Sequence, residues 1–366
     1  MPGNVIGERF VATSFGESHG KCVGIVVDGC PAGLRLGESD IQVQLDRRKP
    51  GTSVVVSQRA EEDRVEILSG VFNGFTTGAP ICMLIWNKDQ DSRPYELIKT
   101  QPRPGHADYP AIVKYAGFAD YRGGGRFSGR LTATIVMAGS IAQKLLQHSL
   151  GIETIAYTKE IGGVKAEIND LMEAKKNRYT NEVRCPDIER AERMKSAIME
   201  AKQAGDSLGG IIECVTTGLP IGLGEPIFAS LESDLSKALF GVPAVKGIEF
   251  GSGFNGARRR GSENNDVYSA QDGRIITSTN NAGGILGGLS NGMPIVIRIA
   301  FKPASSIAKS QKTVDLQSGE QVDLRVPGRH DPCVVPRAPP VVECAVSMVL
   351  ADHALRGGFL PPVLRR

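Results

Sequence analysis

Hydrophobic residues occur along the chain in short runs bounded by Gly, Pro or Asp, which is the pattern of β-strands separated by turns. Runs rich in Val and Ile predict strands at Cys22–Val27, Ser53–Val56, Glu66–Leu68, Pro80–Trp86, Gly210–Val215 and Pro294–Ala300. All of these runs are far shorter than the ~20 residues that a membrane-spanning helix needs, so we expect no membrane association.

Four segments show the apolar spacing of helices instead. They run from Ser39 to Arg48, from Ala133 to Leu150, from the N-cap Asp187 to just before Gly205, and from Ala345 to Leu355. Ser39–Gln42 resembles a capping box that opens the first of them. The second and the fourth are apolar on most sides and are followed by glycines, so we expect buried helices that end at a glycine.

These strands and helices are mixed without a regular strand–helix–strand repeat, which favours an α+β fold over a doubly wound parallel sheet. No linker divides the chain, so we expect one domain over residues 1–366. Hydrophobic residues make up 41% and charged residues 23%, as in ordinary globular proteins. The seven cysteines have no Cys-x-x-Cys spacing and no signal peptide precedes them, so we expect reduced thiols and a cytoplasmic protein.

The formal net charge is only +3, which excludes a strongly basic protein that coats polyanions. The cationic residues are nevertheless clustered. They gather at Arg47-Arg48-Lys49, at Arg122, Arg126 and Arg130 around a glycine triplet, at Arg258-Arg259-Arg260, and at Arg325, Arg329 and Arg337. A solvated face is the alternative for any one cluster. Several converging guanidinium groups would repel each other in an empty site, so together they predict a small polyanionic ligand.

Three of the five histidines, His19, His106 and His330, lie in turn-rich segments, where functional residues are common. His148 and His353 fall late in apolar helices and are expected to be structural. A solvated loop residue is the alternative interpretation for His19 taken alone. The sequence contains no Rossmann or Walker loop, no nucleophile elbow and no set of residues that would bind a metal well.

Three long stretches resemble the characteristic motifs of the chorismate synthase family. They are Gly16–Pro31, Gly125–Ser140 and Arg329–Ala345, with shorter matches at Arg103–Tyr109, Gly283–Gly288 and Lys302–Ser306. The resemblance covers essentially the whole chain in order. It implies a β-α-β sandwich, with central helices between antiparallel sheets, assembled as a homotetramer.

The resemblance also implies an activity. Enzymes of this family convert 5-enolpyruvylshikimate 3-phosphate to chorismate and phosphate by a trans-1,4-elimination in the shikimate pathway, which leads to the aromatic amino acids. They need reduced FMN, although no net redox change occurs. The substrate carries a phosphate and two carboxylates, so we expect Arg48, Arg130 and Arg329 to bind it. Arg47 and Lys49 are second choices, with exposure to solvent as the alternative.

Three residues are assigned catalytic roles from the resemblance. We expect His19, as imidazolium, to donate a proton or a hydrogen bond to the departing phosphate. We expect His106 to stabilise the anionic N1–C2 oxygen edge of the reduced flavin. We expect Asp331 to work with flavin N5 as a relay that removes the ring proton.

The FMN site is assigned in the same way to several separated segments. Its expected members are Arg126, Phe127, Ser128, Pro243, Ala244, Gly287, Lys302, Pro303, Ala304, Ser305, Ser306 and Arg329. Arg329 serves the flavin, the substrate or both. For the glycine position, a tight turn is the alternative.

One departure from the family pattern concerns NADPH. Family members often carry a second Arg where this chain has Val54, so an NADPH contact at that position is in doubt. We therefore expect reduced flavin to come from an external reductase. Two other classes stay open as alternatives. A flavin-dependent oxidoreductase would consume NADPH stoichiometrically with product, and a nucleic-acid binder is disfavoured by the 5% aromatic content.

Overall fold

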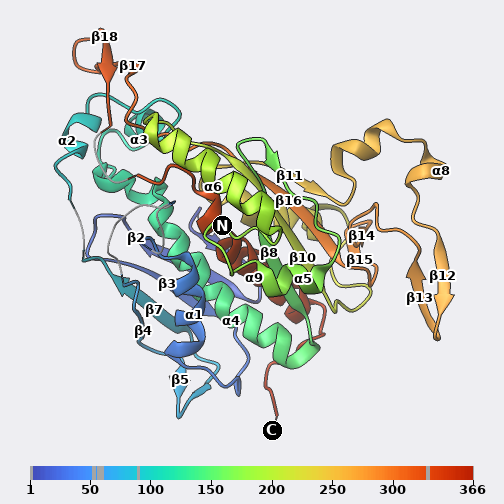
Figure 1. Ribbon diagram of the computed structural model, residues 1–366. Helices are drawn as coiled ribbons and strands as arrows, with labels where there is room; N and C mark the ends of the chain where they lie inside the picture. The colour runs from blue at the N-terminus through green and yellow to red at the C-terminus, as the bar shows by residue number, and fades with distance from the viewer. Residues whose placement is uncertain (1–2, 52–54, 56–61, 89–90, 327–329, 366) are drawn as a thin grey trace.

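Two five-stranded antiparallel sheets enclose a layer of helices in the computed structural model (Figure 1), which describes residues 3–51, 55, 62–88, 91–326 and 330–365. The first sheet has the order β1-β2-β3-β7-β4, with strands at Val5–Ile6, Val11–Gly16, Cys22–Asp28, Ile81–Trp86 and Val65–Ile67. The second has the order β11-β16-β10-β8-β9, with strands at Val245–Phe250, Ile295–Phe301, Gly210–Thr217, Glu153–Ile161 and Val164–Lys165. The strands predicted in these regions are confirmed to within two residues. The strand predicted at Ser53–Val56 lies, apart from Val55, outside the described residues.

The layer between the sheets is made by α1 (Glu38–Arg48), α4 (Thr132–Leu150) and α9 (Ala338–Arg356). Helix α4 packs on β2 and β3 of the first sheet, α9 packs on β8 and β10 of the second, and the two helices pack on each other. The expected β-α-β sandwich with central helices is therefore confirmed.

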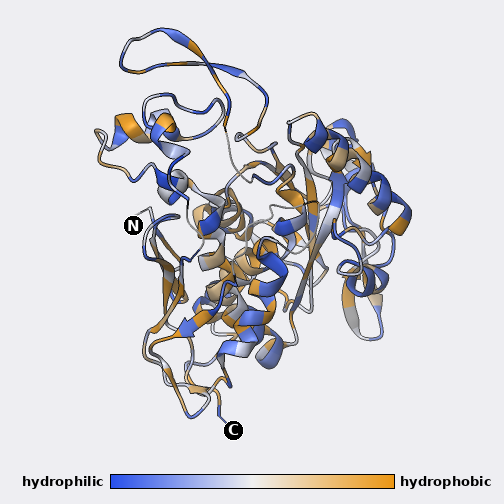
Figure 2. Ribbon diagram, turned by 60° about the vertical axis from the view of Figure 1, so that its left-hand side comes forward, coloured by the Kyte–Doolittle hydropathy of each residue, from blue (hydrophilic) through white to orange (hydrophobic). Residues whose placement is uncertain are grey.

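Helices α4 and α9 are apolar on most sides because they lie between the two sheets, where a helix buries both of its faces. Figure 2 shows hydrophobic residues gathered on these helices, and they belong to one cluster that also includes residues of both sheets. Within the described residues, 335–356 is the one helical stretch long and apolar enough to cross a membrane. Nearly all of it is buried inside the sandwich, so it is a core helix.

The helix ends follow local signals, with two exceptions. Gly151 closes α4 in the left-handed conformation, with φ of 69°, and the Asp187 side chain accepts from the Arg190 N–H at the start of α6 (Ile188–Gln203). The capping box predicted at Ser39 is wrong. Helix α1 begins at Glu38, and Asp40 Oδ2 accepts from the backbone N–H of Gly37, because the aspartate stands three residues after that glycine.

The start predicted for α9 at Ala345 is also wrong. The helix begins two turns earlier, at Ala338. Two prolines, Pro339 and Pro340, made that region an unfavourable place for a helix in the sequence. They occupy its first turn, where the missing N–H groups would have no partner within the helix.

The remaining elements are short and lie around the sandwich. The helices are α2 (Tyr95–Ile98), α3 (Asp108–Lys114), α5 (Leu171–Asn177), α7 (Leu231–Phe240) and α8 (Gly261–Asn264), with 3-10 turns η1 (Arg122–Phe127), η2 (Gly129–Leu131), η3 (Ile227–Ala229), η4 (Gly253–Arg258) and η5 (Val335–Arg337). The two-stranded pairs are β5–β6 (Val71–Phe72, Phe75–Thr76), β12–β13 (Tyr268–Gln271, Arg274–Thr277), β14–β15 (Ile285–Leu286, Leu289–Ser290) and β17–β18 (Gln311–Val314, Gln321–Leu324). Hairpins β12–β13 and β17–β18 project from opposite ends of the molecule (Figure 1). That one domain spans residues 1–366 stays a prediction.

The C-terminal half of α9 is tied to two distant parts of the chain by buried polar groups. Asp352 Oδ1 accepts the backbone N–H groups of Glu8, Arg9 and Phe10 at 2.6–2.8 Å. The next residue, His353, is almost fully buried and contacts Asp234 Oδ2 of α7 through Nε2 at 2.9 Å. These contacts give His353 the structural role expected for it.

The crossing of α4 and α9 depends on the absence of a side chain at Gly139, since a Cβ there would overlap the backbone and Cβ of Cys344. We predict that Gly139→Ala lowers the free energy of unfolding by about 1–3 kcal/mol, the usual cost of overpacking a core. Urea denaturation measures this change. Gly261→Ala is the control, because no atom lies within 4 Å of the added carbon. Equal stability of the two variants would contradict the close packing described here.

Candidate active site

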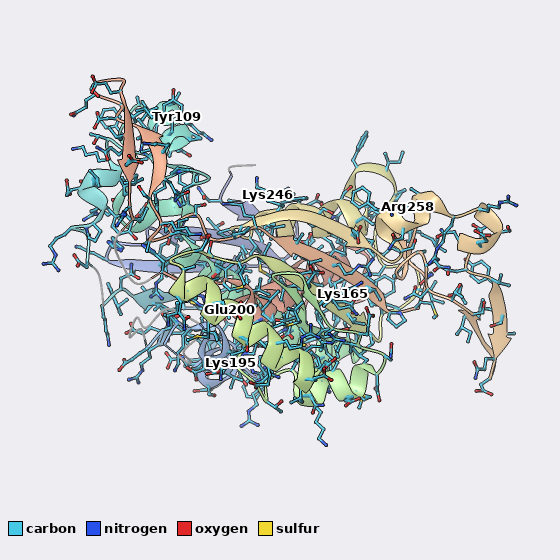
Figure 3. The ribbon with its side chains drawn as sticks, turned by 45° about the horizontal axis from the view of Figure 1, so that its top comes forward. Tyr109, Lys165, Lys195, Glu200, Lys246 and Arg258 are labelled. Carbon is cyan, nitrogen blue, oxygen red and sulfur yellow. The ribbon has the colours of Figure 1, made fainter. Side chains whose placement is uncertain are left out.

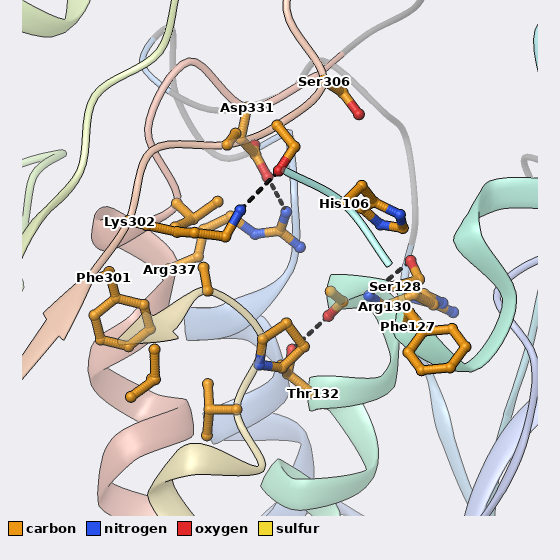
Figure 4. A pocket seen from close by; sticks show the side chains of 18 of the residues that line it. His106, Phe127, Ser128, Arg130, Thr132, Phe301, Lys302, Ser306, Asp331 and Arg337 are labelled. Atoms are coloured by element: carbon orange, nitrogen blue, oxygen red, sulfur yellow. Dashed lines mark hydrogen bonds and ion pairs between the residues drawn. The ribbon is translucent and has the colours of Figure 1, made fainter. Parts of the chain in front are cut away.

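Loops from both sheets and from the helix layer enclose a cavity of about 670 Å³. This volume lies within the range of small-molecule binding sites. Its walls come from the end of α1, the loop before α3, the segment from Gly123 to Thr132, the segment from Phe240 to Lys246, the loop after β16, and the residues around η5. Figure 4 shows Phe301 and Lys302 on one side of it, and His106, Arg130 and Phe127 on the other.

Most of the predicted site residues line this one cavity. They are Arg48, His106, Arg126, Phe127, Ser128, Arg130, Pro243, Ala244, Lys302, Pro303, Ala304, Ser305, Ser306 and Asp331. The segments that carry them are separated by up to about 280 residues in the chain, so the fold brings the expected motifs together. Arg329 lies outside the described residues.

His19 is buried directly behind the cavity wall and is not among the described lining residues. Its Nδ1 contacts Ser92 Oγ at 2.8 Å, and its ring packs edge-on against Tyr95, with 5.2 Å between the ring centroids. Tyr95 and Gly123 both line the cavity. Gly123 has φ of +60°, and a Cβ there would collide with the His19 ring. A glycine at this position therefore lets the cavity wall approach the imidazole closely.

The other predicted residues lie elsewhere. Arg47 packs over the Tyr179 ring at 4.4 Å, and Lys49 pairs with Asp46 at 2.8 Å on the surface of α1. Neither is among the described residues that line the cavity, and both are partly buried, so neither is simply exposed to solvent. Gly287 lies in the two-residue turn between β14 and β15, with φ of 59°, so the tight-turn alternative describes its backbone.

A single carboxylate, that of Asp63, holds the two arginines at the base of the cavity. Asp63 is fully buried, and its two oxygens pair with Arg48, at 2.9 Å, and with Arg130. Other N–H groups of Arg48 donate hydrogen bonds to Thr132 Oγ1 and to the carbonyl oxygens of Gly129 and Arg130. Most donors of Arg48 are therefore bound to the protein itself, and its contribution to a ligand is mainly its charge.

Burial and repulsion from Arg337 lower the pKa of Arg48 to about 9, and Asp63 opposes that shift. The guanidinium therefore stays protonated at neutral pH. Burial alone would raise the pKa of Asp63, but the charges of Arg48 and Arg130 lower it below its usual value. The base of the cavity thus combines two cations with one anion and keeps a net positive charge.

Asp331 is the one carboxylate among the described lining residues, and Arg337 holds it. The Nη1 group of Arg337 donates to Asp331 Oδ2 at 2.6 Å, and its Nε donates to the carbonyl oxygen of Arg48 at 3.0 Å. Figure 4 shows this pair beside Lys302. Arg337 thereby links the carboxylate to the base formed by Arg48 and Asp63.

His106 is oriented by a second buried carboxylate, that of Asp108. Nδ1 of His106 lies 2.6 Å from Asp108 Oδ1, and Arg103 binds both oxygens of Asp108 at 2.7 Å. Burial alone would raise the pKa of Asp108, but the hydrogen bonds from Arg103 and His106 lower it well below its usual value. An ionised carboxylate only accepts hydrogen bonds, so Nδ1 carries the hydrogen of this contact, and Nε2 lies 3.4 Å from Arg103 Nη2.

The loop of His106 is fixed to the loop that follows β16. Lys302 Nζ and Ser305 Oγ both donate to the carbonyl oxygen of Gly105 at 2.7 Å, and Arg103 Nη1 donates to Ser306 Oγ at 2.9 Å. Two motifs almost 200 residues apart in the sequence therefore form one wall.

Four residues of this arrangement carry functions that the sequence did not indicate. Asp63 lies outside every recognised motif and had no signal. Arg337 belonged to a recognised arginine cluster, and Asp108 and Arg103 belonged to the motif of His106, but only the contacts reveal that they hold other side chains. A family motif alone does not distinguish the residues that face a ligand from the residues that hold those ligand-facing side chains in position.

A cavity with several cations, a partly apolar wall, one carboxylate and an oriented imidazole defines an enzyme that binds organic anions. Comparison with known proteins identifies which one. The family model "Chorismate synthase" matches residues 10–355. Chorismate synthases of Dehalococcoides mccartyi and Korarchaeum cryptofilum are 53% and 57% identical, over 99% and 97% of this chain and 100% and 98% of their own.

A solved structure supports the same conclusion. The "Crystal Structure of Chorismate Synthase" aligns with a TM-score of 0.76 at 31% identity, over 96% of this chain and 93% of that one. The chain belongs to the chorismate synthase family. It is a carbon–oxygen lyase of the shikimate pathway that converts 5-enolpyruvylshikimate 3-phosphate to chorismate and phosphate, and its family needs a reduced flavin.

Asp63 is the shared partner of two buried cations, Arg48 and Arg130. We predict that Asp63→Ala lowers the free energy of unfolding by about 3–5 kcal/mol, as expected when a buried ion pair loses one member. Urea denaturation at neutral pH gives the value.

Asp46→Ala is the matched control, since it breaks the exposed Asp46–Lys49 pair and should cost no more than about 1 kcal/mol. If the two variants lost the same stability, Asp63 would not be the counter-ion that holds the base of the cavity together.

Proposed function

We propose that this cavity holds reduced FMN and 5-enolpyruvylshikimate 3-phosphate together. The observation that carries the proposal is the convergence of His106, Asp331 and several cations on a single space of about 670 Å³. The donor set fits a flavin mononucleotide. Phe127, Pro243 and Ala244 offer an apolar surface to a flat ring, and cations beside them suit a phosphate.

The flavin site in this proposal consists of the described lining residues among those expected from the sequence. They are Arg126, Phe127, Ser128, Pro243, Ala244, Lys302, Pro303, Ala304, Ser305 and Ser306. When bound, the reduced flavin supplies electron density to the substrate as its C–O bond to phosphate breaks. Contributions of Arg329 and Gly287 to flavin binding stay predictions.

Arg130 and the charge of Arg48 bind the anionic groups of the substrate in this proposal, with Arg329 as a third partner. Three anionic groups on one small ring require several cations, because an unpaired charge in a cavity is costly. Arg47 and Lys49 have no part in the proposed site, since their contacts lie on other surfaces.

Catalytic roles are divided among three residues. The reaction breaks the C–O bond to phosphate and one ring C–H bond, and the ring gains a double bond. Asp331, held by Arg337, takes the proton. His106, whose ring is fixed by Asp108, stabilises the anionic edge of the reduced flavin. His19 donates toward the departing phosphate. Because Tyr95 and Gly123 form the cavity wall in front of His19, this role requires the imidazole to reach the cavity past these two residues.

The surroundings of the enzyme also belong to the proposal. We expect a homotetramer in the cytoplasm, supplied with reduced flavin by a separate reductase. Sedimentation velocity tests the assembly. An assay with NADPH and oxidised FMN, without added reductase, tests the supply, because chorismate formed under those conditions would show that the chain reduces its own flavin.

The most direct test of the proposed cofactor is an anaerobic assay. Purified protein with reduced FMN and 5-enolpyruvylshikimate 3-phosphate should form chorismate, seen by its absorbance, and an equal amount of free phosphate. One reduced FMN should serve many turnovers. Consumption of one reduced flavin for each product would instead indicate an oxidoreductase.

Variants of the three proposed acid–base residues test the assignment within the site. We predict that His19→Ala, His106→Ala and Asp331→Ala each lower turnover at least tenfold, roughly the lower limit of positioned acid–base catalysis. Flavin binding and the unfolding midpoint should change little. His148→Ala is the control, because His148 is exposed on α4 and far from the lining residues in the fold. Near-normal turnover in any one variant would remove that residue from the mechanism.

A further inference from the structure

Lys246 lines the cavity, although no sequence motif assigned it a role. It stands at the start of β11, where Val245 pairs with Phe301 and Gly247 pairs with Ala300 of β16. Lys246 is therefore the extra residue of a β-bulge. Neighbouring residues of a regular strand point to opposite faces, yet Val245 and Lys246 both line the cavity. Bulges often re-aim a side chain next to a functional site.

The backbone before this bulge is also unusual. Ala244 has φ of +73°, a left-handed conformation that is uncommon for a residue other than glycine. Its carbonyl oxygen accepts the backbone N–H of Lys302 at 2.9 Å. This hydrogen bond joins the start of β11 to the loop after β16, so two lysines from different segments are held at one end of the cavity. In Figure 3, Lys246 lies between Tyr109 of α3 on one side of the view and Arg258 of η4 on the other.

These two lysines differ in their counter-ions from four of the five arginines among the described lining residues. Arg48 and Arg130 share Asp63, Arg337 has Asp331, and Arg103 has Asp108, whereas Arg126 donates to neutral oxygens of Gly16, Asn4 and Ser14. Among the described residues, the Lys302 ammonium group donates only to neutral oxygens, the carbonyl of Gly105 and the hydroxyl of Ser305. Over the described part of the chain, Lys246 has neither a hydrogen bond nor an ion pair.

Lys246 and Lys302 carry like charges and line the same cavity. Burial and the charge of Lys246 together lower the pKa of Lys302. Two like charges without a carboxylate destabilise the empty site, and a dianion placed between them would relieve that repulsion. A phosphate monoester has this charge and three acceptor oxygens.

We propose that Lys246 and Lys302 form a binding site for the phosphate of a phosphomonoester, with Lys246 as its previously unassigned member. The inference rests on the proposed function, in which both ligands carry such a group. The source is the flavin or the substrate, and Lys302 lies across the cavity from Arg130 (Figure 4). A phosphate bound by the two lysines would lie across the cavity from the anionic groups that Arg130 binds. The most highly charged groups of the two ligands would then be kept apart.

Anaerobic equilibrium dialysis with reduced FMN and reduced riboflavin tests this site, because the two flavins differ only in the phosphate. Lys246→Gln removes the charge and shortens the side chain by one atom, while a polar end group remains. We expect this variant to raise the dissociation constant for FMN about tenfold or more, the order expected of a lost charge-assisted hydrogen bond. Riboflavin affinity should be unchanged, and Lys246→Arg should restore most of the FMN affinity.

Lys165→Gln is the matched control, since Lys165 is an exposed strand lysine on β9 (Figure 3) and is not among the described residues that line the cavity. If the flavin affinities are unchanged and calorimetry shows weaker binding of 5-enolpyruvylshikimate 3-phosphate, the site holds the substrate phosphate, and the proposal stands. Unchanged affinity for both phosphate esters would overturn it. So would an equal loss of FMN and riboflavin affinity, because the lysine would then act on the ring or on the fold.

Inorganic phosphate separates this inference from the proposed function. If the wild-type protein bound neither flavin nor substrate, the proposed function would fail, but the lysine pair could still be tested. Inorganic phosphate should then raise the melting temperature of the wild-type protein more than that of Lys246→Gln. Equal shifts in the two proteins would overturn the site itself.

Discussion

The pairing of two buried guanidinium groups with one buried carboxylate is the interaction on which the cavity depends. Arg48 and Arg130 lie almost fully inside the protein, and Asp63 pairs with both of them. A buried charge without a partner costs several kcal/mol in a protein interior, so this pairing stabilises the site. One carboxylate for two cations lets the chain fold around the site and still leaves a net positive charge for an anionic ligand.

The same arrangement recurs around the other functional side chains. Arg337 holds Asp331 and Arg103 holds Asp108, which in turn orients His106. Each acid or base of the cavity is thus fixed by a partner outside the reacting groups. The β-α-β sandwich makes this possible, because loops from both sheets and the ends of α1 and η5 meet at one place. The helices and strands bring the functional segments to the cavity, and short ion pairs fix the orientation of their side chains.

Much of this could be predicted from the sequence. Apolar periodicity located α4 and the strands, Gly151 and Asp187 marked helix ends, and long family motifs identified the cavity-lining loops. The failures have local causes. Prolines concealed the first turns of α9, and Asp40 formed its capping box with Gly37 and not with the expected Ser39. Asp63 could not be predicted, since its importance arises from two contacts over 15 and 67 residues of chain.

Placement of His19 shows a further limit. Its motif is specific, yet sequence alone gives no indication that Tyr95 and Gly123 stand between its imidazole and the cavity. Charge clusters have the same weakness, because Arg47 and Arg48 are neighbours in sequence but contact different surfaces. The position of each residue around the helix and its contacts with distant residues decide which of two adjacent residues faces a ligand. A local motif specifies neither of them.

A crystal structure of the protein with FMN and 5-enolpyruvylshikimate 3-phosphate is the most direct test of whether one cavity binds both ligands. We expect density for both molecules in this cavity, with the flavin ring along Phe127 and Ala244 and the substrate within reach of Arg130, His106 and Asp331. Density for either ligand at a separate site, with this cavity empty, would contradict it.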